Sequence, residues 1–454
     1  MAKWLTAFLL LVALTGCAQP QTSTLVAPTR LPSPVSPTLT PAAVFTEHPA
    51  QPSSTPTATP PKPSDKRLNM ACLNIEPTLP PEINANGILV LSDQTEGSDG
   101  RYKNLDRYLM DMATRSMTQI AKPDEYLGEF SVSPDRKWIA YDDSVSKDPR
   151  DAVFHLVIAN AQNKVYKTLP EEKEWRAFDW LDNQRLIIDT GTDNEGDWRA
   201  TFLVLNPFTG ERKILTTDFP SMYNFHDGPP MVYDPTLNRV VYLHGEFGYG
   251  ELHYVLWDIQ QKKQLAGFHV LPPFSAARWS PDGKQFAVAP ALFPEVAPPS
   301  PHGKFHPASN ELLEELYSVD RDGKITQLTH LLDDYPRVYI DNFRWSPDGR
   351  SIAFWFSSWQ DDIDLSDDPI GNRYLALLDT TTGRVTNTCI HGENDASIGI
   401  SKYPAPIWSP DGKQVVVQSQ ISEESFQTVL VDIQQNRAFK IGEDLAPMGW
   451  MIAP

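Results

Sequence analysis

The sequence is poor in cysteine and in positive charge. Its 454 residues include three cysteines and 39 Lys+Arg against 58 Asp+Glu, which gives a formal net charge of -19. No cluster of Lys and Arg supplies the cationic footprint that DNA and RNA binders need, so the sequence excludes nucleic acid as a partner. The same charge balance disfavours direct adsorption to an anionic membrane surface.

Familiar catalytic motifs are also missing. The chain contains no Gly-x-Ser-x-Gly nucleophile turn, no phosphate-binding glycine loop and no metalloprotease helix motif. The repeats described below occupy the body of the chain and leave no segment for a separate hydrolase domain. The sequence therefore favours a binding role over an enzymatic one.

Residues 1–16 have the features of a secretory signal peptide. Lys3 supplies the positive start, and the apolar run 5–14 is too short to span a bilayer as a mature helix. Leu14-Thr15-Gly16-Cys17 follows directly and resembles the bacterial lipobox, in which the peptide is cut before the cysteine and the thiol is lipidated. We expect Cys17 to anchor the protein in a membrane. The alternative is a soluble exported protein with a cysteine at that place.

Residues 17–67 are rich in Pro, Thr, Ser and Ala and contain almost no large apolar side chains. Such a composition cannot bury enough surface to offset the entropy of the chain, so this segment is predicted to be a disordered tether. In polyproline II conformation, at ~3.1 Å per residue, it would reach on the order of 100 Å from the membrane. It acts either as a stalk that crosses an envelope layer or as a plain linker.

The body of the chain is organised around a repeated turn. Trp345-Ser346-Pro347-Asp348-Gly349 recurs at 279–283 and at 408–412. Pro fixes one φ angle, Asp bonds to nearby backbone, and Gly accepts the left-handed conformation that closes a short hairpin. In two imperfect copies, Asn183 and Asn238 are predicted to replace Gly, because Asn tolerates this conformation best among the other residues.

An apolar strand follows each turn, and spacings of roughly 45 to 65 residues fit four-stranded propeller blades with loop insertions. The first blade lacks a strand before its turn, whereas the segment 448–454 is left over at the C-terminal end. We therefore predict an all-β, seven-bladed β-propeller over residues 68–454, closed by the C-terminal strand joining the first blade. The seven strands start near Gly87, Lys137, Arg185, Arg239, Lys284, Arg350 and Lys413.

The turn motif and its strands resemble the TolB-type, WD-like repeat of bacterial propellers over residues 87–454. The resemblance implies the fold. It is weak for function, because such propellers serve as protein-binding platforms, as gating domains of peptidases and as enzymes. The chain departs from TolB in its lipobox, in having seven repeats rather than six, and in leaving no room for an N-terminal α/β domain. The partners of TolB are therefore not carried over.

Cys72 and Cys389 remain once Cys17 is assigned to the lipid anchor. An exported protein meets an oxidising compartment in many bacteria, so an even pair suggests a disulfide. Cys72 precedes the first blade and Cys389 lies near the end of the sixth. A bridge would staple the N-terminal segment close to the ring closure and would stabilise the fold by a few kcal/mol in the entropic model. The alternative is two separate buried thiols.

Two insertions carry candidate ligand-binding residues. Asp361 and Asp364 belong to a run of carboxylates that suits calcium in ligand type, and a second acidic group lies at 189–197. Neither group matches a spaced calcium-loop motif, so a solvated acidic loop is the simpler interpretation. Trp198 and Trp359 lie in these loops, where they would stack on a sugar or on a partner's side chain, or pack against the adjacent blade. The cofactor is unknown, with calcium as one possibility.

Other patterns have structural interpretations. The Trp and Asp of the repeated turns recur in several blades, and a residue that recurs in this way is explained by the blade itself. His302 and His306, like His244 and His253, lack a clear third partner for zinc. The segment 312–316 is apolar and acidic and suggests a short helix.

The sequence thus predicts a lipid-anchored, extracytoplasmic propeller that binds a protein or glycan ligand through its loop-rich face, most simply as a monomer. The alternative from another class is a propeller enzyme of the lactonase, lyase or glycosidase type with a metal or carboxylate site on that face. A third possibility is a spacer with no dedicated ligand.

Overall fold

The computed structural model describes the second of two units into which the chain divides, Met1–Lys62 and Pro63–Pro454. The predicted signal peptide, Cys17 and the tether lie outside the described residues. Within these residues, no helix is long and apolar enough to cross a membrane. The described ranges are 68–93, 107–120, 130–144, 154–169, 177–189, 201–216, 231–244, 252–270, 277–290, 313–359, 372–392, 405–422 and 425–453.

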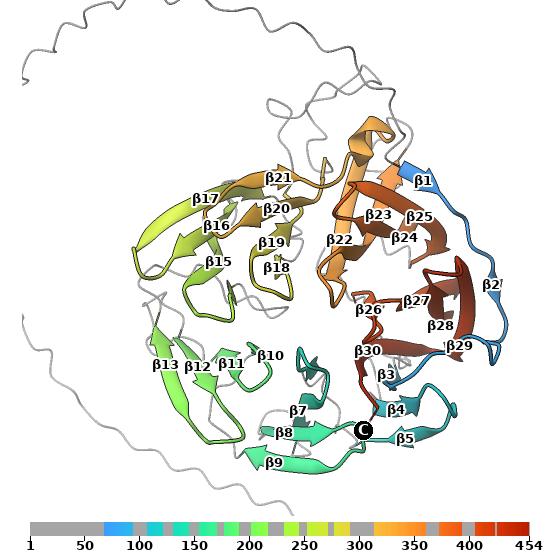
Figure 1. Cartoon of the computed structure of the whole chain (residues 1–454), viewed down its shortest axis with the longest axis horizontal. Coiled ribbons are helices and arrows are strands. Elements are labelled where there is room, and N and C mark those ends of the chain that lie inside the picture. Colours follow the sequence, from blue (N-terminus) through green and yellow to red (C-terminus); the bar gives the residue numbers. More distant parts are fainter. Residues whose placement is uncertain are drawn as a thin grey trace, which may run out of the picture. The chain divides into compact units, whose positions relative to one another are not determined.

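Seven sheets surround a common axis and form a β-propeller, as predicted (Figure 1). Blades two to five each contain four antiparallel strands that follow one another in the chain. Blade two has β6 (Phe130–Val132), β7 (Trp138–Ser144), β8 (Phe154–Asn160) and β9 (Val165–Leu169). Blade three has β10 (Ala177–Trp180), β11 (Leu186–Asp189), β12 (Thr201–Leu205) and β13 (Arg212–Thr216). Blade four has β14 (Met231–Tyr233), β15 (Arg239–His244), β16 (Leu252–Asp258) and β17 (Lys263–Val270). Blade five has β18 (Arg278–Trp279), β19 (Gln285–Val288), β20 (Tyr317–Asp320) and β21 (Ile325–Gln327).

Blades one, six and seven differ from this plan. Blades six and seven each gain a fifth strand from the N-terminal segment, a feature that the sequence did not predict. Blade six has β22 (Arg337–Trp345), β23 (Ser351–Trp359), β24 (Asn372–Asp379), β25 (Arg384–His391) and, outside them, β1 (Leu68–Met70). Blade seven has β26 (Ile407–Trp408), β27 (Gln414–Ser422), β28 (Ser425–Asp432), β29 (Arg437–Glu443) and, outside them, β2 (Ile75–Glu76). Blade one has β30 (Leu445–Met451), β3 (Ile88–Asp93), β4 (Arg107–Asp111) and β5 (Met117–Gln119). A 3-10 helix, η2 (Leu331–Asp333), precedes blade six.

The repeated turn has the geometry that its sequence predicts. In blade six, the Ser346 hydroxyl donates to Oδ1 of Asp348 over 2.6 Å, and the Gly349 N–H donates to the Ser346 carbonyl over 2.9 Å. Gly349 has a φ of 70°, and Gly283 and Gly412 have φ values of 64° and 71°. Only Gly adopts this left-handed conformation without strain, so the recurring Gly is explained by the turn.

The prediction that Asn replaces Gly in the imperfect turns is wrong. In blade four the left-handed residue is Leu237, with a φ of 57°, and neither Asn183 nor Asn238 has a positive φ. The buried carboxylate of Asp234 accepts hydrogen bonds from the N–H groups of Asn238 and Arg239 over 2.8 and 2.6 Å. Leu237 occupies the position that Gly283 has in the repeated turn, because its N–H donates to the Asp234 carbonyl over 2.9 Å just as the Gly283 N–H donates to the Ser280 carbonyl over 2.8 Å. Asn238 therefore lies one residue beyond the left-handed position.

The segment 313–316 is not the predicted helix. Leu313 forms an isolated parallel bridge with Val338, and the Glu314 N–H donates to the Val338 carbonyl over 2.9 Å. Leu313 and Leu316 are buried against blade six. The extended conformation is therefore favoured over a helix, because it buries both leucines and also satisfies backbone hydrogen-bonding groups.

The core is distributed over the interfaces between blades. Seven clusters of buried apolar residues occur in the described part of the chain, and each joins two neighbouring blades. The cluster with Leu89 and Val416 joins blade one to blade seven, and the cluster with Val90 and Ile139 joins blade one to blade two. The ring is thus closed by side-chain packing on both sides of blade one.

The C-terminal strand completes blade one, which confirms the predicted closure. β30 pairs antiparallel with β3, with Met451 opposite Ile88. The Trp450 indole N–H donates to the Asn86 carbonyl over 2.9 Å. The N–H of Ile452 then donates to a carbonyl in the β6–β7 turn of blade two over 3.0 Å. The end of the chain is therefore tied to both of the blades that it brings together.

Residues 68–86, here called the N-terminal strap, cross the outer edges of blades six and seven before entering blade one (Figure 1). β1 runs parallel to β25, and β2 runs parallel to β29. Cys72 forms a disulfide with Cys389 of β25, with the two Cα atoms 4.7 Å apart. Arg437 of β29 donates through Nε and Nη2 to the Glu76 carboxylate over 2.7 and 2.6 Å. The strap therefore covers two sheet edges that would otherwise be open.

Candidate functional site

In blades three, five, six and seven, the Trp that precedes the turn joins neighbouring blades at the ring axis. In every case its indole N–H donates to the backbone carbonyl of the residue that precedes the equivalent position in the previous blade. These bonds explain why the Trp recurs, and they fix the spacing of the innermost strands. They run from Trp180 to Ser131 (3.3 Å), from Trp279 to Val232 (3.0 Å), from Trp345 to Arg278 (3.1 Å) and from Trp408 to Arg344 (3.0 Å).

The residue before the Trp, or before its equivalent, occupies the same position on each of these innermost strands. We call these side chains the axial residues. Unlike the Trp, they differ in chemistry from blade to blade. They are Ser131 in blade two, Asp179 in blade three, Val232 in blade four, Arg278 in blade five, Arg344 in blade six and Ile407 in blade seven.

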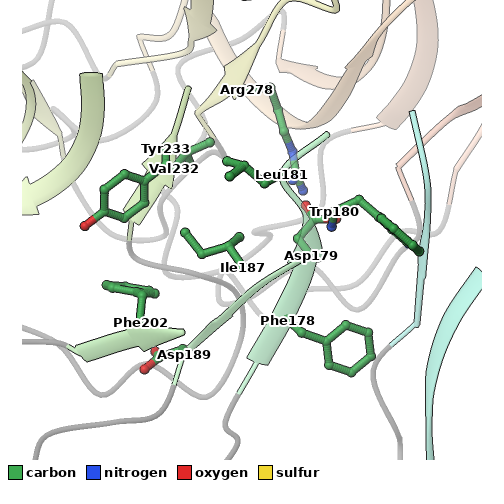
Figure 2. A pocket seen from close by; sticks show the side chains of 10 residues that line it. All are labelled: Phe178, Asp179, Trp180, Leu181, Ile187, Asp189, Phe202, Val232, Tyr233 and Arg278. Carbon is green, nitrogen blue, oxygen red and sulfur yellow. The ribbon is translucent and has the colours of Figure 1, made fainter. Parts of the chain in front are cut away.

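A cavity of about 70 Å³ lies where the innermost strands of blades three and four meet, with one side chain contributed by blade five. Figure 2 shows Arg278 extending from β18 toward Asp179 of β10. Most of the remaining wall is apolar and aromatic. The cavity is lined by Phe178, Asp179, Trp180, Leu181, Ile187, Asp189, Phe202, Val232, Tyr233 and Arg278.

Asp179 is held in place by one of its two carboxylate oxygens. Oδ1 accepts hydrogen bonds from the Ser131 hydroxyl and from the N–H of Trp180, the latter over 2.8 Å. Among the described residues no partner engages Oδ2 of Asp179. The side chain is therefore oriented by the scaffold and keeps an acceptor for a ligand.

Arg278 and Arg344 have no hydrogen bond or ion pair through their guanidinium groups within the described ranges. The Nε atom of Arg278 is buried and unpaired. The pKa of Arg344 is lowered to about 10, first because the surrounding protein reduces its hydration, and then because Arg278 repels its charge. Asp179 opposes this shift, and Arg136 adds to it. Four charged groups from four blades are therefore near one another at the axis.

Arg136 belongs to the turn between β6 and β7 and has a φ of 60°. Its Nη1 donates to the carbonyl of Trp408 in blade seven, and its own carbonyl accepts the N–H of Ile452. Burial lowers its pKa to about 10, an effect that the carboxylate of Asp411 opposes. Arg136 therefore has a structural role at the closure in addition to its positive charge.

Among the axial residues, Arg278 and Arg344 stand against the single carboxylate of Asp179, so these positions carry a net positive charge although the chain as a whole carries a net charge of -19. A guanidinium group binds carboxylate and phosphate through two parallel N–H bonds. The arrangement therefore suits an anionic group. Among the residues that the structure describes, no group of three or more His, Cys, Asp or Glu side chains could hold a metal.

Most of the ligand-binding residues predicted from the sequence lie outside the described ranges. This applies to Trp198, Asp361 and Asp364, so the predicted calcium site stays a prediction. Trp359 is the last residue of β23, where it pairs with Arg337 of β22, and its side chain is not described.

The histidine pairs are placed in part. His244 and His253 lie opposite each other on β15 and β16, whereas His302 and His306 fall outside the described ranges. Of the second acidic group, Asp189 lines the cavity, and the rest of that group lies beyond the described part of the chain.

The sequence analysis missed the axial arginines. Their signal was present, because Arg278 and Arg344 stand directly before Trp279 and Trp345, at equal positions of two adjacent repeats. Isolated arginines of this kind do not form a cluster in the sequence. Only the ring, which brings equivalent positions of successive blades together, makes them neighbours.

The geometry and the seven sheets define the class of the protein as a seven-bladed β-propeller with a charged axial site.

No protein-family model matches the chain, and no curated protein matches it. Among solved structures it is similar to TolB from Acinetobacter baumannii, with 14% identity, 80% of this chain and 82% of that chain covered, and a TM-score of 0.40. It is also similar to the β-propeller domain of the Trilobed protease from Pyrococcus furiosus, with 14% identity, coverages of 78% and 98%, and a TM-score of 0.47. Oligogalacturonate lyase from Vibrio parahaemolyticus matches with 10% identity, coverages of 78% and 86%, and a TM-score of 0.45. Likenesses this distant bear on the fold alone.

Proposed function

We propose that this protein is a lipid-anchored, extracytoplasmic binding module whose propeller captures an anionic group of a protein or glycan at the ring axis. The observation that carries the proposal is the pair of axial arginines, Arg278 and Arg344, which lie on adjacent innermost strands without any side-chain partner in the described residues.

Two unpaired guanidinium groups that repel each other reduce the stability of the free protein. A fold keeps such an arrangement where it serves a site, and an anionic ligand removes the cost by supplying the missing charge. Because the molecule as a whole is strongly acidic, it repels anions in bulk. Binding would therefore depend on the local arginines rather than on the net charge.

The proposed location rests on the lipobox-like segment that ends at Cys17 and on the tether at 17–67. The disulfide between Cys72 and Cys389 supports it, because such bonds persist in oxidising compartments. In this account the tether holds the propeller away from the membrane, where it meets ligands of the cell envelope.

The test is a calorimetric titration of residues 68–454 with two polyanions of equal charge, a hexamer of galacturonate and a hexamer of glutamate. We expect wild type to bind at least one of them, and Arg278→Gln/Arg344→Gln to lose at least tenfold in affinity. Arg350→Gln/Arg384→Gln is the matched control, because it removes the same charge from exposed positions.

The two polyanions distinguish a glycan ligand from a protein ligand. Equal losses in the axial and the control variants would show that only net charge matters, which contradicts the proposal. An absence of binding by both polyanions at millimolar concentration would also contradict it.

A further inference from the structure

The cavity at the ring axis combines three kinds of wall within a small volume. Arg278 supplies a cation, Asp179 supplies a free carboxylate oxygen, and apolar side chains such as Leu181 and Phe202 supply the remainder. A simple anion would need only the cation. The free carboxylate oxygen and the apolar wall suit a ligand that also carries a hydrogen-bond donor and an apolar group.

We propose that the cavity binds an aminoacyl carboxylate: an α-carboxylate with an adjacent N–H and a small apolar side chain. This inference rests on the proposed function, since it names the anionic group that the axial arginines hold. Two kinds of molecule carry such a group: a peptide, in its carboxyl-terminal residue, and a free amino acid. Arg278 takes the carboxylate, Oδ2 of Asp179 accepts the N–H, and the side chain enters the apolar part of the cavity.

The hydrogen bonds of Asp179 support its part in this arrangement. Its Oδ1 is occupied by the Ser131 hydroxyl and the Trp180 N–H, which leaves Oδ2 as the acceptor. A carboxylate beside the arginines would repel a simple anion, so its presence favours a ligand with a donor next to its own carboxylate. Asp189 also lines the cavity, but it lies well away from Arg278 in Figure 2 and already has another contact.

The volume limits the side chain of the ligand. A cavity of about 70 Å³ is less than half of the ~150 Å³ in which benzene binds inside a protein. It therefore has room for a methyl or isopropyl group, and a phenyl ring exceeds it. We expect ligands that end in alanine or valine to bind more tightly than those that end in phenylalanine.

The experiment uses calorimetry on residues 68–454 with N-acetyl-Gly-Gly-Val, its C-terminal amide, N-acetyl-Gly-Gly-Phe and free valine. The acid should bind at least tenfold more tightly than the amide and than the phenylalanine peptide. Arg278→Gln should lower the affinity for the N-acetyl-Gly-Gly-Val acid at least tenfold, whereas the exposed control Arg384→Gln should leave this affinity unchanged.

A second variant tests the apolar wall. Val232→Phe adds volume at the cavity while both axial arginines remain, so its affinity for the valine peptide should fall at least tenfold. Melting temperatures of both variants check that they are folded. Tight binding of free valine would identify an amino acid as the ligand, and preference for the peptide would identify a carboxyl terminus; both support the inference.

Equal binding of acid and amide would overturn the inference. So would failure of every aminoacyl probe at millimolar concentration while a hexameric polyanion still binds through the axial arginines, a result that leaves the proposed function standing. Failure of the polyanions and of the aminoacyl probes together would remove both.

Discussion

At the scale of single residues, the repeated and the unrepeated positions have different roles. Trp345 and Trp408 recur because their indole N–H groups bond to the preceding blade, with distances of 3.1 and 3.0 Å. The axial residues beside them are free to vary, because only their backbone carbonyls take part in these bonds. The side chains at the axial positions can therefore be charged, polar or apolar without disturbing the hydrogen bonds between blades.

Glu315 gives a prediction for the dependence of stability on pH. It is 1% exposed, and its carboxylate accepts hydrogen bonds from the Thr329 hydroxyl and from the N–H of Leu332 over 2.8 Å. Burial nevertheless raises its pKa from 4.5 to about 7, because these hydrogen bonds do not offset the loss of hydration. Asp333 raises the pKa further by repulsion.

The folded protein therefore binds this proton more tightly than the unfolded chain does. Ionisation of Glu315 costs free energy in the folded state, so its contribution falls as pH rises from about 4.5 to about 7 and is constant above that range. Glu315→Gln should be more stable than wild type at pH 8, by roughly 3 kcal/mol at most, and should lose this advantage at pH 5. Urea unfolding at the two pH values measures the difference. A difference that does not change with pH contradicts the assignment.

At the scale of elements, the N-terminal strap is the part that the sequence did not predict. Strands β1 and β2 are only three and two residues long, and they pair in parallel with β25 and β29. Such short pieces have no periodicity of their own. Their conformation depends on open sheet edges elsewhere in the chain, which can be recognised only when the ring is built.

The disulfide should account for a large part of the stability of this strap. Cys72→Ser/Cys389→Ser should reduce the free energy of unfolding by about 2–5 kcal/mol, because the bond closes a loop of 317 residues in the unfolded chain. Denaturant unfolding with and without a reducing agent measures the loss. Cys17→Ser is the control, since it leaves the pair intact. Two results together would contradict the structure: a double variant as stable as wild type, and a wild type whose stability does not change when reductant is added.

The C-terminal strand should be essential to the ring. A chain that ends at Asp444 lacks β30, so β3 becomes an open edge and Leu89, which is fully buried, loses part of its cover. We expect this truncation to abolish cooperative thermal unfolding or to yield insoluble protein. A chain that ends at Ile452 keeps the strand and its bond to blade two, and should unfold like wild type. Equal melting temperatures for both truncations would refute this role.

At the scale of the whole molecule, much of the fold could be predicted from the sequence because each blade carries its own turn. The number of blades and the closing strand followed from counting strands after turns such as 345–349. The axial site could not be predicted, because Asp179, Arg278 and Arg344 are separated by about one repeat or more and become neighbours only in the closed ring. The left-handed position of blade four was misplaced by one residue, because Leu237 rather than Asn238 occupies the place of the turn glycine.

The anchor belongs to this scale as well. If Cys17 is lipidated, the full chain expressed in bacteria should incorporate a labelled fatty acid and sediment with membranes. Cys17→Ser should lose the label and appear in the soluble fraction, with the propeller unchanged in melting temperature. A labelled Cys17→Ser protein, or an unlabelled wild type, would show that the lipobox-like segment does not function as an anchor signal.

The most direct test of the account compares the thermal unfolding of wild type and Arg344→Gln as citrate is added at constant ionic strength. Without citrate, the variant should melt at a higher temperature, because it has lost a cation that Arg278 repels. With citrate, the melting temperature of wild type should increase until it exceeds that of the variant, because the anion binds the folded protein through the axial arginines. A variant that is less stable than wild type throughout, with no response of wild type to citrate, would show that Arg344 is a structural residue and that the ring axis is not an anion site.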